Sequence, residues 1–230
     1  MTKVLAVCNL KGGTGKTTLA VNLACAYAAR HRVVLLDADR QAGASGWTAN
    51  GGSPVRARPM PLEAQVGTEA EAEARRADWV TQVLNLRRSA ELTVIDLPPQ
   101  FEESVAGALA LADLLVIPVT PGGAELAATR RAKTLLERAR VARPDRALDC
   151  VLVPNRVDRR TAIGRALSHT LSEMDESVGP TVRQRSQQSE AYLAGTWIGG
   201  HAPDSEAHKD IMALAKFLTD RLFRSEPHSN

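Results

Sequence analysis

The sequence predicts an α/β fold with a mostly parallel, twisted sheet that is flanked by helices on both faces. Short apolar runs recur along the 230 residues and alternate with segments of helical spacing. The runs lack polar alternation, which is typical of parallel strands that are buried on both faces. Several runs end on Asp or Asn, at the edge where the carboxyl ends of parallel strands meet and where ligands bind.

The order of the apolar runs and helical segments defines the expected elements. Five strands are predicted at residues 4–8, 32–36, 92–95, 114–119 and 148–153. Helices are predicted at 16–30, across most of 63–88, and at about 101–112, 124–142, 161–175, 186–194 and 204–224. A short helix and an edge strand at 55–58 are expected within 41–59, and another short strand at 181–182. The chain has no internal repeat and no long linker, so we expect a single domain over residues 1–230.

Composition excludes several classes of protein. Hydrophobic residues make up 44% and the formal net charge is +3, which is ordinary for a globular protein. Aromatic residues are only 3%, which argues against a single-strand binder that stacks bases. Three distant cysteines, Cys8, Cys25 and Cys150, exclude a disulfide framework and a cysteine zinc site. No apolar stretch reaches 18 residues, so we expect a soluble, cytoplasmic protein without a transmembrane helix.

A glycine-rich segment between the first strand and the first helix is typical of a phosphate-binding loop. Its glycines let successive backbone N–H groups face a polyphosphate, and the following helix adds its positive dipole end. Lys16 is placed to reach the β- and γ-phosphates, and the Thr17 hydroxyl to ligate Mg²⁺. The strict pattern has glycine where this chain has Leu10, so the match is to the variant in which a lysine precedes the glycine pair. The candidate nucleotide-binding residues are Lys11, Gly12, Gly13, Thr14, Gly15, Lys16, Thr17 and Thr18.

Lys11 is a second cation beside the one that serves the phosphates. From the residues alone it is either a solvated loop lysine or a lysine that reaches a second nucleotide across a dimer interface.

Three aspartates follow two of the predicted strands. Asp37 and Asp96 are placed to hold Mg²⁺ through water, and Asp39 to orient the attacking water. The alternative for an aspartate at a strand end is a helix N-cap or a turn.

The segment Asn155-Arg-Val-Asp158 follows the fifth strand. Asn155 can pair with a purine edge, and the Asn-x-x-Asp pattern is also that of guanine-reading GTPases, with Arg156 in the place of lysine. An ordinary turn is the alternative, so this segment leaves the choice between ATP and GTP open.

Taken together, these motifs resemble the ParA/MinD family of deviant-Walker ATPases, and most closely the short plasmid-type ParA partition proteins. The likeness rests on residues 11–18 and on Leu35-Leu-Asp-Ala-Asp-Arg-Gln41, Val94-Ile-Asp-Leu-Pro-Pro99 and Asp113-Leu-Leu-Val-Ile-Pro-Val-Thr-Pro121, and it extends over nearly the whole chain. Arg40 departs from the pattern, because the family usually has proline after the second aspartate.

The resemblance implies a P-loop NTPase fold and a homodimer that encloses Mg²⁺ and ATP. We expect slow intrinsic hydrolysis, because no arginine finger is apparent in the loop. It implies that Lys11 contacts the nucleotide of the partner subunit, so Lys11, Lys16 and Asp39 form the catalytic set. It places Asn155, Pro118 and Pro121 on the adenine side, and it favours ATP over GTP.

The resemblance also implies non-specific DNA binding by the ATP dimer, nucleoid association, and hydrolysis stimulated by a ParB-like or cargo-adaptor partner. Within the basic clusters of this chain, Arg159, Arg160, Arg183 and Arg185 are the predicted DNA contacts. The expected function is therefore plasmid or chromosome segregation.

Three other functions fit the same motifs. The first is a ParA-like ATPase that positions another cargo. The second is a MinD-like ATPase that cycles on membranes through residues 216–223. We favour packing of that terminal helix on the domain, because Asp220 interrupts its basic face, so a membrane partner is not expected. The third is a GTPase or a small-molecule kinase, for which no acceptor pocket is identified.

Overall fold

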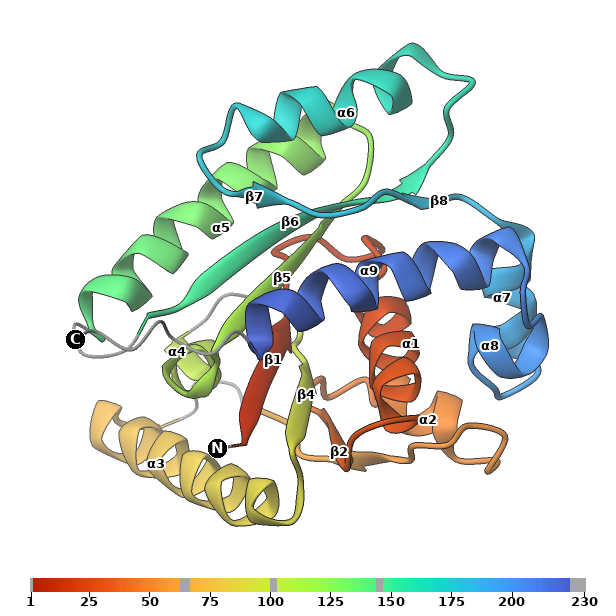
Figure 1. Ribbon diagram of the computed structural model, residues 1–230. Coiled ribbons are helices and arrows are strands. Elements are labelled where there is room, and N and C mark those ends of the chain that lie inside the picture. The colour runs from red at the N-terminus through yellow and green to blue at the C-terminus, as the bar shows by residue number, and fades with distance from the viewer. Residues whose placement is uncertain (1, 63–66, 100–102, 144–146, 224–230) are drawn as a thin grey trace, which may run out of the picture.

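The computed structural model describes residues 2–62, 67–99, 103–143 and 147–223. Eight strands form one sheet whose pairings are parallel (Figure 1). They are β1 (Lys3–Val7), β2 (Val33–Asp37), β3 (Ala57–Pro59), β4 (Leu92–Asp96), β5 (Leu114–Val119), β6 (Asp149–Val157), β7 (Ser177–Val178) and β8 (Val182–Arg183). The order is β3-β2-β4-β1-β5-β6-β7, and β8 also pairs with β6. The predicted parallel sheet is thereby confirmed.

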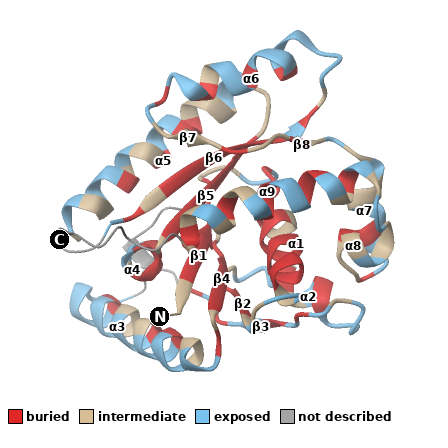
Figure 2. Ribbon diagram, in the orientation of Figure 1, coloured by how far each residue is buried: buried red, intermediate tan, exposed pale blue. Residues whose placement is uncertain are grey.

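Helices cover both faces of this sheet (Figures 1 and 2). They are α1 (Lys16–Ala28), α2 (Gly43–Thr48), α3 (Glu69–Leu86), the 3₁₀ turn η1 (Arg87–Ser89), α4 (Glu103–Leu111), α5 (Gly123–Val141), α6 (Ala162–Ser172), α7 (Ser186–Leu193), α8 (Ile198–His201) and α9 (Glu206–Leu222). One hydrophobic cluster joins the sheet to α3, α4, α5 and α6, and a second joins it to α1, α2, α7, α8 and α9.

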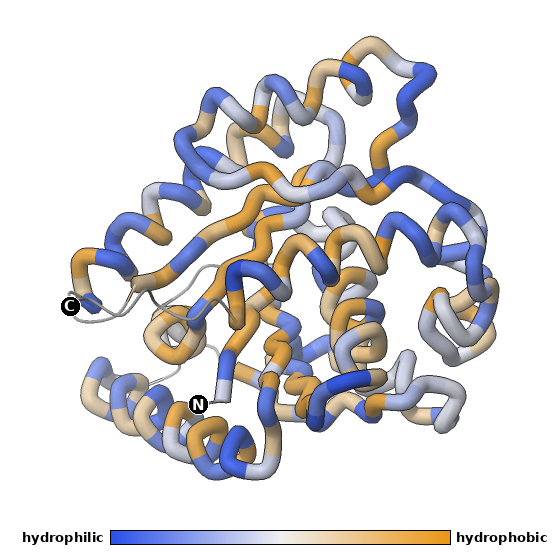
Figure 3. The backbone as a smooth tube through the Cα atoms, in the orientation of Figure 1, coloured by the Kyte–Doolittle hydropathy of each residue, from blue (hydrophilic) through white to orange (hydrophobic). Residues whose placement is uncertain are grey.

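The central strands explain why their sequences do not alternate. Every residue of β4 and β5 is buried. In β1, Val4 and Ala6 belong to the first cluster, and Leu5 and Val7 to the second. Each strand therefore packs both of its faces against helices, and Figure 3 shows the resulting apolar centre.

Several element boundaries differ from those predicted. Asp37 and Asp96 are the last residues of β2 and β4, and Asn155 lies inside β6 instead of beyond it. β6 is longer than expected because its end pairs with β8, a contact that the local pattern does not show. The edge strand is at 57–59, and β7 and α8 were not predicted. The predicted helix starts at 63 and 101 and the end at 224 lie outside the described residues.

The terminal helix α9 packs on the domain, as favoured. Its buried residues include Ile211, Leu214 and Leu218, and the Tyr27 hydroxyl of α1 donates a 2.9 Å hydrogen bond to the Ala215 carbonyl. Among the described helices, none combines the length and the apolar character needed to cross a bilayer.

Candidate nucleotide-binding site

The glycine-rich loop lies between β1 and the N-terminus of α1. Gly13 and Gly15 have φ of 78° and 90°, in the left-handed region that favours glycine. A Cβ atom at Gly15 would lie 2.3 Å from Asn155 Nδ2, so a larger residue is excluded there. Because α1 begins at Lys16, its free N–H groups and dipole face this loop. The geometry is that of an anion site.

Lys16 is buried within the loop, and its ammonium donates to the Lys11 carbonyl at 3.2 Å. Burial lowers its pKa, and the nearby carboxylates, Asp96 first, counteract that shift. The cation therefore lies under the loop with acidic groups close by, where a phosphate chain would meet it.

The predicted acidic residues converge as expected. Asp96 is fully buried, and burial raises its pKa to about 7. The Thr17 hydroxyl and the Lys16 ammonium lower that pKa, whereas Asp37 and Asp39 raise it. Asp37 accepts hydrogen bonds from the backbone of Asp39 and Ser45. The structure thus gathers both strand-end aspartates beside the start of α1.

The Asp96 carboxylate shows whether the acidic residues fit a Mg²⁺ ion. Both oxygens are buried, and neither accepts a hydrogen bond of normal geometry from the described residues. The nearby Thr17 hydroxyl nevertheless stabilises the charged form, because it lowers the pKa of Asp96. No group of three or more His, Cys, Asp or Glu side chains in the described chain forms a complete metal cage. Mg²⁺ commonly binds one or two carboxylates together with water and substrate phosphates. The residues present fit such an ion, and their individual roles remain predictions.

In the single chain without nucleotide, Lys11 is paired within its own subunit, and its contact with a partner's nucleotide stays a prediction. Its ammonium forms an ion pair with Glu125 near the start of α5, and its side chain is 41% exposed. The hydrogen bond from Lys11 lowers the pKa of Glu125. A contact with a partner's nucleotide would therefore require Lys11 to leave Glu125.

The end of β6 contacts the loop directly. The Asn155 amide donates to the Thr14 carbonyl at 2.7 Å, and the Arg156 guanidinium donates to the Gly13 carbonyl at 2.9 Å. Asn155 was expected to pair with a base, whereas at least one of its amide hydrogens is used on the loop. Arg156 was missed as a site residue, and its place in the Asn-x-x-Asp pattern was the available signal.

Arg160 binds the Asp158 carboxylate and lowers the pKa of Asp158 to about 2.

A cavity of about 380 Å³ opens beside the loop, within the size range of small-molecule sites. Thr18, Asn155 and Arg156 line it together with residues 182–185 and the outer side of α7. In the described part of the chain, Pro118 and Pro121 do not line it; the Pro118 carbonyl instead accepts a hydrogen bond from Asn9 at 2.6 Å.

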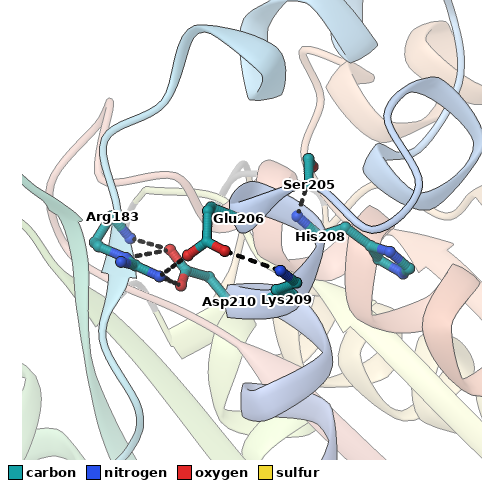
Figure 4. Close-up of polar contacts among 6 residues, drawn as sticks. All are labelled: Arg183, Ser205, Glu206, His208, Lys209 and Asp210. Carbon is teal, nitrogen blue, oxygen red and sulfur yellow. Dashed lines mark hydrogen bonds and ion pairs between the residues drawn. The ribbon is translucent and has the colours of Figure 1, made fainter.

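The predicted DNA contacts have different environments. Arg183 is held by Asp210 and Glu206 of α9, with a closest contact of 2.5 Å to Asp210 (Figure 4). Arg160 is paired with Asp158. Arg185 lines the cavity, and Arg159 is exposed. The ion pairs of Arg183 therefore join β8 to α9. DNA binding by the four predicted arginines stays a prediction.

Residues 5–196 match the model of the CobQ/CobB/MinD/ParA nucleotide-binding domain. Two similar proteins are called "Maintenance of carboxysome distribution protein A". The one from Gloeobacter kilaueensis is 34% identical over 231 residues, covering 96% of each chain. The one from Halothiobacillus neapolitanus is 31% identical over 199 residues, covering 84% of this chain and 85% of that protein.

Among solved structures, a putative plasmid partition protein from Borrelia burgdorferi bound to AMPPNP has a TM-score of 0.77. It is 16% identical, and the match covers 96% of this chain and 100% of that chain. At that identity the likeness supports the fold alone.

Proposed function

Because this chain belongs to the CobQ/CobB/MinD/ParA nucleotide-binding domain family and is a P-loop ATPase, we propose that its ATP cycle positions a large protein assembly inside the cell. The observation that carries the proposal is the similarity to carboxysome distribution proteins, which at 34% identity extends over 96% of both chains. Plasmid or chromosome segregation, the function expected from the motifs, is the second candidate. The two carboxysome distribution proteins favour a protein assembly over DNA as the cargo.

The proposed cycle uses the residues that the structure gathers. Lys16 and the loop N–H groups bind the phosphates of ATP, and Thr17, Asp37 and Asp96 would hold Mg²⁺, the two aspartates through water. The ion would neutralise charge on the β- and γ-phosphates. Asp39 orients the attacking water. Its Oδ1 accepts a hydrogen bond from the Gln41 backbone, which fixes the carboxylate at the rim of the site.

Dimerisation is the conformational switch in this proposal. Lys11 exchanges Glu125 for the γ-phosphate bound by the partner subunit, so the closed dimer forms only with a triphosphate. The dimer holds non-specific DNA through paired basic surfaces, with Arg159 and Arg160 the exposed candidates on each copy. An adaptor protein on the cargo then stimulates hydrolysis, the dimer opens, and the DNA is released.

Deletion of the gene in its source organism tests the choice of cargo. We expect the assembly to cluster or to lie off-centre when cells are viewed by electron cryotomography, because its positioning force is lost. Plasmid retention and chromosome inheritance are expected to stay at wild-type levels. Plasmid loss or anucleate cells with normally distributed assemblies would instead support the partition function. Re-expression of the wild-type gene provides the control.

A further inference from the structure

The end of β6 carries an irregularity directly beside the phosphate loop. The register of β6 against β8 shifts between Asn155 and Val157, as in a β-bulge. Arg156, the residue in between, has a φ of 52°, in the left-handed region that is sterically unfavourable for a residue with a side chain. Bulges commonly redirect a side chain next to an active site, and backbone strain tends to persist where function requires it.

The bulge places two consecutive donors against two consecutive acceptors. Arg156 Nη1 donates to the Gly13 carbonyl at 2.9 Å, and Asn155 Nδ2 donates to the Thr14 carbonyl at 2.7 Å. In a regular strand, neighbouring side chains point to opposite faces, so they could not both reach one loop. Asn155 is 3% exposed, which makes its contact with the loop a buried one.

These two hydrogen bonds hold the carbonyl groups of two loop peptides, and they thereby determine where the N–H groups of the same peptides point. The loop peptides are trans, so each C=O group is directed away from the N–H group of the same unit. The Gly13 carbonyl shares its peptide with the Thr14 N–H, and the Thr14 carbonyl shares its peptide with the Gly15 N–H. Fixing both carbonyls toward β6 therefore directs the Thr14 and Gly15 N–H groups away from β6.

We propose that Asn155 and Arg156 are positioning residues that set the orientation of the phosphate-binding N–H groups before nucleotide arrives. Donors held in place bind an anion better than donors that must be ordered on binding. The inference rests on the ATPase activity and not on the identity of the cargo. A failed cargo experiment would therefore leave it standing.

The left-handed backbone at Arg156 permits a clean test. Arg156→Gly removes the guanidinium and also relieves the unfavourable φ, so the nucleotide-free protein is expected to keep its melting temperature within about 4 °C. Its affinity for ADP, measured by isothermal titration calorimetry, is expected to fall about tenfold or more. Arg156→Lys retains a cationic donor and is expected to bind ADP within about threefold of wild type.

Arg138→Gln is the matched control, because it removes an equal charge from an exposed position on α5. It is expected to leave ADP affinity unchanged. Wild-type ADP affinity in Arg156→Gly would overturn the proposal. So would equal losses in the glycine and lysine variants, because the donated hydrogen bond would then not be the cause.

Discussion

Lys16→Ala is expected to weaken binding of ATP and ADP by at least about 100-fold. The ammonium of Lys16 is buried under the loop, where charge-assisted hydrogen bonds to phosphates are not weakened by competing water. The substitution also leaves the buried carboxylate of Asp96 without its nearby cation. Titration with a fluorescent ADP analogue measures the loss.

Lys216→Ala is the control for charge, since Lys216 is exposed on α9 and far in sequence from the loop. It is expected to bind nucleotide as the wild type does. Retention of near wild-type ADP affinity in Lys16→Ala would show that the loop N–H groups alone hold the phosphates.

Asp96→Asn is expected to stabilise the nucleotide-free protein at pH 8 by on the order of 2 kcal/mol, while it abolishes ATP hydrolysis. The folded-state pKa of Asp96 is about 7, above the ordinary value of 3.8. A carboxyl group with a raised pKa costs stability as it ionises. The wild-type free energy of unfolding should therefore fall as the pH rises from about 4 to about 7 and stay level above that range. The asparagine amide keeps the shape of the side chain without the charge.

Urea denaturation of both proteins at pH 5 and pH 8 measures this difference. The stability gain from Asp96→Asn is expected to be larger at pH 8 than at pH 5. Asp220→Asn, at an exposed position of α9, should change stability little at either pH. A destabilised Asp96→Asn at pH 8 would mean that the carboxylate is already compensated in the nucleotide-free protein.

The sequence predicted where the glycine loop and the strand-end aspartates lie, for identifiable reasons. Gly13 and Gly15 lie in the segment that was predicted to be a phosphate loop, and both adopt the positive φ that such a loop requires of glycine. Asp37 and Asp96 end neighbouring parallel strands, whose carboxyl ends must lie together. Their place at the same edge of the sheet follows from the strand pattern alone.

The contacts that could not be predicted join residues that are distant in the chain. Glu125 lies 114 positions from Lys11, and their pairing depends on β1 and β5 being neighbours. Nothing local indicates that Arg183 binds Asp210 on α9. Arg156 reaches Gly13 only through the bulge, which arises from pairing with β8. In each case the sheet order decides the partner, and local periodicity does not specify that order.

Sedimentation velocity of the wild-type protein with Mg²⁺ and AMPPNP, compared with ADP and with no nucleotide, tests the central claim most directly. A species of twice the monomer mass is expected with Mg²⁺ and AMPPNP, and not with ADP or without nucleotide, because the γ-phosphate is what draws Lys11 away from Glu125. Lys11→Ala should bind AMPPNP and remain monomeric. A wild-type protein that stays monomeric when saturated with Mg²⁺ and AMPPNP would contradict the proposed switch.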